Sequence, residues 1–181
     1  MRLLLGIAGG IAAYKTPDLV RHLRRRGHEV RCIVTAAGSR LVAVDALAAV
    51  SGQPVATSLW PDDGTMPHIA LARWAEGLLI APATADLLAR TSLGLADDLL
   101  TTVLLAVEPT VPVWWCPAMN TQMWNKPPVQ EHLARLRGWG HRIIGPVPGD
   151  LACGESGLGA METPERIAAA VSGSGAGDAG S

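Results

Sequence analysis

The sequence lacks the patterns that define several common protein classes. Its three cysteines, Cys32, Cys116 and Cys153, have no paired spacing, which argues against a disulfide framework or a zinc site and favours a reducing compartment. It has no long basic run and its formal net charge is −1, so nucleic acid is not the expected partner. No apolar run is long enough to cross a bilayer. We therefore expect a cytoplasmic protein that binds neither nucleic acid nor membranes.

What the chain does contain is an alternation of two kinds of segment. Short apolar runs predict strands at 2–8, 29–35, 77–81, 111–116 and 141–144, and apolar residues at helical spacing predict helices at 11–26, 43–50, 84–92, 97–107 and 127–138. In 181 residues, of which 49% are hydrophobic, this alternation predicts one α/β domain. We expect a Rossmann-like (flavodoxin-like) fold, a parallel sheet with helices on both faces, and a ligand at the carboxyl ends of the strands.

Two segments fall outside this alternation. The connection 145–163 is rich in glycine and proline, and a long connection of this kind is typical of a lid or clamp. From residue 172 onward, glycine, serine, alanine and aspartate predominate. We expect residues 1–171 to form the folded domain and residues 172–181 to form a disordered tail.

Glycines separate the first predicted strand from the first predicted helix. Backbone N–H groups at Gly9 and Gly10 could hold a phosphate, although glycine also serves tight turns for steric reasons alone and the pattern is not G-x-G-x-x-G. The second and third strands end in similar small and hydroxylic residues, at 35–39 and 81–86. Because the ends of parallel strands meet at one edge of the sheet, these three strand ends favour a phosphate-containing ligand.

The segment 117–124 (PAMNTQMW) follows a predicted strand and permits two interpretations. It places an amide, two thioethers and an indole together, and the side chain of Asn120 offers both a donor and an acceptor to a substrate carboxylate or amide. The alternative is a strand-to-helix turn in which Asn120 is the N-cap. The first interpretation predicts a substrate site that includes Met119 and Met123.

Two further side chains are candidates for catalysis. His68 precedes a helical stretch at 69–74 and could act as a base near neutral pH, the alternative being a surface or capping histidine. Cys153 lies in a glycine-rich loop, where a thiol could act as a proton donor or nucleophile. Cys32 and Cys116 fall within apolar strands and are expected in the core. The other four histidines show no metal-ligand spacing, so no metal is expected.

Taken together, these segments resemble the homo-oligomeric flavin-containing cysteine decarboxylases. This family contains phosphopantothenoylcysteine decarboxylase and the peptidyl-cysteine decarboxylases of lantibiotic biosynthesis. The resemblance covers about residues 3–168. It is carried by blocks at 9–15 (GGIAAYK), 68–69 (HI) with 73–75 (RWA), 81–85 (APATA), 96–100 (ADDLL), 117–124 and 152–154 (ACG).

The resemblance implies FMN as the cofactor, held at the strand ends. The candidate cofactor-binding residues are Gly9, Gly10, Ile11, Thr35, Ala36, Ala37, Ser39, Arg73, Thr84, Ala85, Asp86 and Leu87. It also implies that the cysteine side chain of the substrate is oxidised to a thioaldehyde, with hydride passing to the flavin and His68 as the base. Loss of carbon dioxide then leaves an enethiol. Asn120 would grip the substrate carboxylate or its amide, with Met119 and Met123 packed around it.

The resemblance leaves two substrates open. In the phosphopantothenoylcysteine enzymes, a cysteine matching Cys153 helps to reduce the enethiol, which favours coenzyme A biosynthesis. Three features favour instead a ribosomal, lantibiotic-type peptide ending in cysteine, and we place this substrate first. We expect a free-standing enzyme, whereas bacterial coenzyme A enzymes are usually fused to a synthetase domain. Leu41 stands where those enzymes commonly have Phe, and Ala160 stands where fused ones usually have Arg, although free-standing ones share the Ala.

A third possibility is a flavin-binding regulatory subunit that has lost the chemistry. The presence of His68, Asn120 and Cys153 counts against it. The family also implies self-association as trimers or trimers of trimers, with FMN at a subunit interface. The partners we expect are therefore a substrate ending in cysteine and further copies of the same chain.

Overall fold

The fold is built on a five-stranded parallel sheet with the strand order β2-β1-β3-β4-β5. The computed structural model describes residues 1–61, 64–150, 154 and 156–173. The strands are β1 (Arg2–Ile7), β2 (Glu29–Val34), β3 (Gly77–Ala83), β4 (Val113–Pro117) and β5 (Arg142–Ile143). The neighbouring strands β1 and β3 pair in the register Leu3 with Gly77 to Gly6 with Ile80. From β1 the chain passes to β2 at one edge of the sheet, and from β2 it returns to the other side of β1 to form β3, β4 and β5. This strand order is that of the flavodoxin-like fold.

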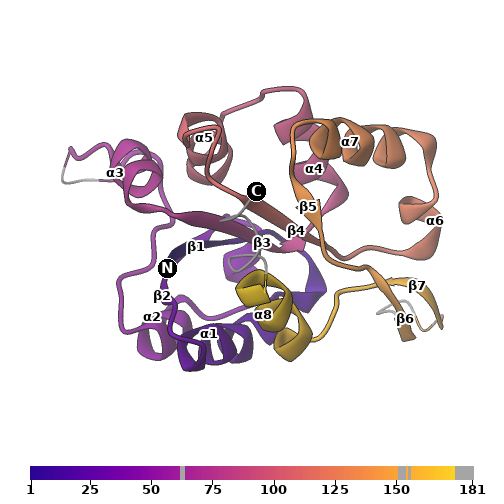
Figure 1. Cartoon of the computed structure of the whole chain (residues 1–181), viewed down its shortest axis with the longest axis horizontal. Helices are drawn as coiled ribbons and strands as arrows, with labels where there is room; N and C mark the ends of the chain where they lie inside the picture. The colour runs from indigo at the N-terminus through magenta and orange to yellow at the C-terminus, as the bar shows by residue number, and fades with distance from the viewer. Residues whose placement is uncertain (62–63, 151–153, 155, 174–181) are drawn as a thin grey trace, which may run out of the picture.

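Helices cover both faces of the sheet (Figure 1). On one face lie α1 (Thr16–Arg25), α2 (Val44–Ser51) and α8 (Pro164–Gly173), and on the other lie α3 (Pro67–Trp74), α4 (Ala85–Ser92), α5 (Leu99–Ala106) and α7 (Pro127–Gly138). Side chains alternate along β1, so that Leu3, Leu5 and Ile7 join the first core and Leu4 joins the second. The expected parallel sheet with helices on both faces is confirmed.

Local capping explains where several helices begin. Asp98 accepts a hydrogen bond from the backbone N–H of Thr101 (2.7 Å), and the Thr101 hydroxyl is bonded in return by the backbone N–H of Asp98 (3.2 Å). This capping box starts α5 two residues later than the hydrophobic periodicity predicts. The predicted helix 11–26 is divided into a 3₁₀ helix η1 (Ile11–Lys15) and α1, with Pro17 in the first turn of α1. A further 3₁₀ turn, η2 (Gly38–Arg40), follows β2.

The segment 145–163 contains more structure than its composition predicts. The strands β6 (Val147–Asp150) and β7 (Ser156–Ala160) pair antiparallel and form a hairpin beside the short helix α6 (Thr121–Trp124) (Figure 1). The hairpin corrects the expectation of a loop without strands. Its glycines have little strand propensity of their own, and they pair here because they pack on the chain after β4. The last helix, α8, was also not predicted. It includes residues 172 and 173 of the expected tail, and residues 174–181 lie outside the described part.

In the part of the chain that the structure describes, no helix combines the length and the apolar character needed to cross a membrane.

Candidate active site

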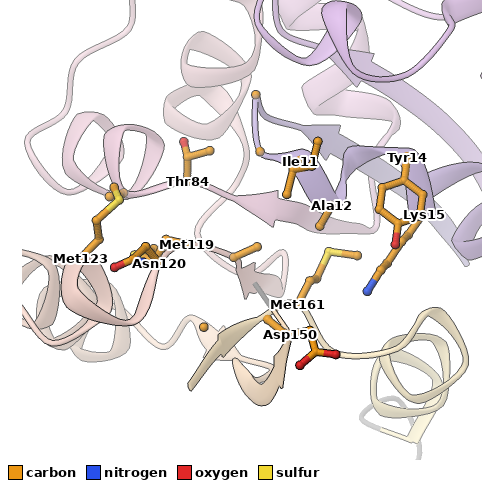
Figure 2. Close-up of a pocket in the computed structure, with 16 residues that line it drawn as sticks. Ile11, Ala12, Tyr14, Lys15, Thr84, Met119, Asn120, Met123, Asp150 and Met161 are labelled. Carbon is orange, nitrogen blue, oxygen red and sulfur yellow. The ribbon is translucent and has the colours of Figure 1, made fainter. Parts of the chain in front are cut away.

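A cavity of about 520 Å³ opens at the carboxyl ends of β1, β3 and β4 (Figure 2). It lies at the β1/β3 switch point, where ligands bind in open α/β sheets, and its volume is in the range typical of small-molecule sites. The residues that line it are Gly9, Gly10, Ile11, Ala12, Tyr14, Lys15, Thr84, Ala85, Ala118, Met119, Asn120, Met123, Asp150, Gly159, Ala160 and Met161. The structure therefore brings together eight of the residues expected to bind cofactor or substrate: Gly9, Gly10, Ile11, Thr84, Ala85, Met119, Asn120 and Met123.

The turn after β1 forms one wall of this cavity and requires glycine. A Cβ built on Gly9 would collide with Cβ of Ala37, in the turn after β2. A Cβ on Gly10 would lie 3.3 Å from the Pro82 ring. The backbone N–H of Ala8 donates to the Pro82 carbonyl oxygen (3.3 Å), which ties the β1 turn to the end of β3. The close approach of three strand ends, rather than a positive φ, explains the glycine pair.

The wall at the end of β3 begins with Thr84, the N-cap of α4. Its hydroxyl oxygen accepts a hydrogen bond from the backbone N–H of Leu87 (3.3 Å), and the hydroxyl hydrogen is still able to donate into the cavity. The expected cofactor residues Asp86 and Leu87 do not line the cavity. The Asp86 carboxylate is paired with Arg90 (2.9 Å), and the Leu87 side chain is buried in the core.

Asn120 is an N-cap and also lines the cavity. Its side-chain oxygen accepts a hydrogen bond from the backbone N–H of Gln122 (2.7 Å), so it is the N-cap of α6. The same residue lines the cavity beside Met119 and Met123 (Figure 2). The side-chain amide nitrogen of Asn120 carries N–H donors, the kind of group that binds a carboxylate.

The hairpin β6–β7 closes the cavity from the side of β4. Its two alternate glycines pack directly on the chain after β4: a Cβ on Gly157 would collide with the Thr121 hydroxyl, and a Cβ on Gly159 would collide with the Met119 carbonyl oxygen. The hairpin also carries Asp150 into the cavity wall, where its carboxylate accepts a hydrogen bond from the Ser156 hydroxyl (2.6 Å). In the described part of the segment 145–163, which was expected to be a lid or clamp, two paired strands therefore lie beside the cavity.

The turn after β2 contributes to this site indirectly. The Thr35 hydroxyl donates to the Ile7 carbonyl oxygen (3.3 Å) and accepts from the backbone N–H of Gly38 (3.1 Å), and the Ser39 hydroxyl donates to the Ala36 carbonyl oxygen (2.9 Å). None of Thr35, Ala36, Ala37 and Ser39 lines the main cavity. Thr35 and Ala36 line a second, smaller cavity of about 240 Å³ together with Asp97 and Asp98. Both hydroxyls thus make hydrogen bonds within the turn or to the end of β1, and their expected contact with a phosphate stays a prediction.

His68 and Arg73 lie away from the cavity. Both belong to α3, which sits at the end of the molecule opposite the hairpin (Figure 1). The side chain of His68 is half-buried, and its buried Nδ1 has no hydrogen-bond partner among the described residues. Arg73 is exposed. Within one chain, the structure does not bring the candidate base to Asn120, and Cys153 lies outside the described residues.

The other two cysteines are core residues, as predicted. Cys32 and Cys116 are free and buried on β2 and β4. Burial raises the pKa of the Cys32 thiol to about 12, and burial together with the nearby charge of Glu162 raises the pKa of Cys116. Both thiols are therefore protonated at neutral pH and are not nucleophiles.

Several residues that line the cavity were not singled out by sequence reasoning. Ala118 and Met161 add apolar surface, and Tyr14, Lys15 and Asp150 add polar groups. Lys15 stands in the 9–15 block that carries the family resemblance, so a signal for it was present. Asp150 had none, because its place in the wall depends on the pairing of the hairpin.

The volume and the lining of the cavity fit FMN. Its floor is the glycine turn, where added Cβ atoms would collide with neighbouring strand ends, and its walls are largely apolar, as an isoalloxazine ring requires. Thr84 and the N-terminus of α4 provide a hydroxyl and free backbone N–H groups for a phosphate.

The fold and this cavity define a flavodoxin-like domain with a ligand site at its topological switch point. The chain belongs to the flavoprotein family, whose sequence model matches residues 1–174.

Known proteins place it more narrowly. The coenzyme A biosynthesis bifunctional protein CoaBC of Vibrio vulnificus is 46% identical over 170 residues, which make up 93% of this chain and 42% of that protein. The chain thus spans about two fifths of the length of this relative. A structure of a PPC (phosphopantothenoylcysteine) decarboxylase variant with pantothenoylaminoethenethiol is 35% identical, has a TM-score of 0.83 and matches 94% of this chain and 95% of its own. The FMN-dependent cysteine decarboxylase SpaF is 35% identical, has a TM-score of 0.80 and matches 97% and 98%. The resemblance to flavin-containing cysteine decarboxylases is confirmed.

Proposed function

We propose that this chain is an FMN-dependent decarboxylase that converts 4′-phosphopantothenoylcysteine to 4′-phosphopantetheine. The observation that carries the proposal is the cavity itself, which places Asn120 and two methionines opposite the glycine turn of a flavoprotein. The 46% identity to a coenzyme A biosynthesis protein and the likeness to a PPC decarboxylase support this substrate over a peptide. The buried free thiols are in keeping with the reducing cytoplasm that we expect.

The described residues would position the substrate rather than react with it. When bound, FMN supplies the electron acceptor for oxidation of the cysteine side chain. The amide nitrogen of Asn120 donates to the carboxylate that is lost, and Met119 and Met123 form apolar walls that hold the side chain and exclude water. The hairpin β6–β7 covers this site, and its contact with Met119 holds the wall in place.

The proton acceptor is proposed to come from a second copy of the chain. His68 is the expected base, but it lies on α3, far from its own cavity (Figure 1). Its buried Nδ1 has no hydrogen-bond partner among the described residues. Self-association that brings α3 of one copy to the cavity of another would complete the site, in keeping with the oligomers expected from the family. Cys153 remains the proposed donor for reduction of the enethiol.

A peptide ending in cysteine is the second candidate substrate. The observation in its favour is the match to SpaF over 98% of that protein's length. In addition, Met123 at the rim of the cavity is 48% exposed, so the rim is open to solvent and has room for a longer substrate. The position at which this sequence ends does not discriminate between the two substrates.

Mass spectrometry of the products tests the proposal. The purified yellow protein is incubated separately with 4′-phosphopantothenoylcysteine and with peptides ending in cysteine. Loss of carbon dioxide alone from the pantothenoyl compound is the redox-neutral result and is expected here. Loss of carbon dioxide plus two hydrogens from that compound would show decarboxylation without the final reduction. Oxidative decarboxylation of a peptide, with the pantothenoyl compound untouched, would replace this proposal with the peptide function.

A further inference from the structure

Among the residues that the structure describes, two charged side chains face the cavity, and they come from opposite walls. Lys15 is contributed by η1, after the glycine turn, and Asp150 by the hairpin strand β6. The other described residues that line the cavity are uncharged. Figure 2 shows Asn120 toward one end of the cavity and Lys15 toward the other. A substrate held at Asn120 by its carboxylate would therefore extend toward the ammonium group.

The Lys15 ammonium has no anionic partner within the described residues. Its Nζ lies 5.8 Å from the centroid of the Tyr14 ring. No carboxylate of the described residues lies within salt-bridge distance of it. The residue is half-buried, so part of its hydration is lost without compensation. A half-buried cation without a counter-ion, in a cavity of ligand size, is suited to an anionic group of the ligand.

Asp150 has the opposite effect on such a group. Its carboxylate is exposed and is oriented by the 2.6 Å hydrogen bond from Ser156. It can accept from hydroxyl or amide donors of a substrate, but it repels a phosphate in the same cavity. Lys15 would therefore strengthen the preference for an anionic substrate, and Asp150 would weaken it.

We propose that Lys15 binds the terminal phosphate of the substrate and, opposed by Asp150, sets the preference for phosphorylated over unphosphorylated pantothenoylcysteine. This inference rests on the proposed function and adds to it the residues that read the substrate's charge. The carboxylate of the substrate is assigned to Asn120, and the phosphate of FMN is assigned to Thr84 and the start of α4, so Lys15 is left for the distal phosphate.

Steady-state kinetics with the two substrates test the assignment. For Lys15→Gln we expect KM for the phosphorylated substrate to rise roughly 10- to 100-fold, as for loss of a charge-assisted hydrogen bond, with kcat and the unphosphorylated substrate little affected. For Asp150→Asn we expect the opposite, a fall of about two- to fivefold in the same KM. Lys15→Arg should restore the preference, and added salt should weaken it only in proteins that carry a cation at this position.

The matched control is Lys126→Gln, because Lys126 is the other lysine of the chain, is exposed and does not line the cavity. Four results would overturn the inference: an equal loss with both substrates in Lys15→Gln, loss of bound FMN in that variant, a wild-type enzyme indifferent to the phosphate, or a weakened preference in Asp150→Asn. If the wild-type protein converts neither pantothenoyl compound, the proposed function fails instead, and this result is distinguishable from the other four.

Discussion

The backbone N–H of Met119 donates a 3.0 Å hydrogen bond to the carbonyl oxygen of Gly159. This bond joins the chain after β4 to the hairpin strand β7, and it is possible only because Gly159 has no side chain to strike the Met119 carbonyl oxygen. The glycine thus links the proposed substrate wall to the element that covers it. Each part of this arrangement leads to a measurable expectation.

Gly159→Ala should separate the hairpin from the cavity. The added methyl group would collide with backbone rather than with a flexible side chain, so we expect a loss of about 1–3 kcal/mol in the free energy of unfolding and at least a tenfold fall in turnover. Urea unfolding and steady-state kinetics measure the two effects. Gly138→Ala, near the end of α7 with open space around it, is the control and should be neutral or slightly stabilising. Unchanged turnover in Gly159→Ala would show that the hairpin contact is dispensable.

Gly9→Ala should weaken flavin binding more than it weakens the fold. Its methyl group would meet Cβ of Ala37 and push the glycine turn away from the end of β2. The flavin-to-protein ratio, measured from absorbance after gel filtration, should fall at least severalfold, while circular dichroism stays that of an α/β protein. A variant that keeps its full flavin content would place the cofactor away from this turn.

Two substitutions at Asn120 separate its structural and functional roles. Asn120→Asp keeps an oxygen for the Gln122 N–H, so the helix cap survives, but it places a negative charge where the substrate carboxylate is expected. We expect normal stability and normal flavin content with turnover reduced by about 100-fold or more. Asn120→Ala should additionally lose about 1 kcal/mol of stability. If Asn120→Asp turns over normally, the residue is a cap and nothing more.

Complementation between variants tests whether His68 acts in a neighbouring copy. Purified His68→Asn should stay yellow and lose turnover, and Asn120→Asp should do the same. If the chain self-associates as proposed, co-expression of the two from separately tagged genes should give mixed oligomers, in which some sites combine an intact His68 with an intact Asn120. Activity should then reappear in the doubly tagged fraction. Its continued absence, with mixed oligomers present, would rule out a base supplied in this way.

The stability of the protein should fall on mild acidification because of His141. The indole N–H of Trp115 donates to Nδ1 of His141 (3.1 Å), which requires that nitrogen to be unprotonated, and burial lowers the pKa of His141 from its ordinary 6.5. Since the unfolded chain binds the proton more readily, the free energy of unfolding is highest above pH 6.5 and decreases as the pH falls toward the folded-state pKa.

Urea midpoints between pH 7.5 and 5, roughly the range over which histidine titrates, measure this effect. The decline should be shallower in His141→Gln than in wild type. His22→Gln, which changes a histidine on the outer side of α1, is the control. An identical slope in wild type and His141→Gln would show that another group causes the pH dependence.

Periodic hydrophobicity was sufficient to predict the five strands of the sheet and most of its helices. Strands such as β3 are buried along their whole length, and helices such as α7 bury one face, so both leave a pattern that does not depend on distant residues. The hairpin was missed for the opposite reason. The strand Ser156–Ala160 (SGLGA) has low intrinsic strand propensity and pairs where Met119 and Thr121 support it. The helix α8 was missed although Ile167, Ala168 and Val171 recur at helical spacing.

In the candidate site, too, some features could be predicted from the sequence and others could not. Gly9, Thr84 and Asn120 follow strands, and parallel topology places all strand ends at one edge, so their meeting could be predicted. The turn at Thr35 also ends a strand, yet its hydroxyl is used within its own turn, which only the hydrogen bonds reveal.

The sequence alone determined that this protein is an α/β domain with a ligand site at its strand ends, because local periodicity and parallel topology suffice for that conclusion. The flavin was implied by the resemblance of its sequence blocks to a known family. Tertiary structure alone decided that Lys15 and Asp150 share the cavity, that glycines seat the hairpin, and that His68 lies beyond the reach of its own site. These facts concern distances between elements far apart in the chain. Such distances are set by packing and by backbone contact, which leave no period in the sequence.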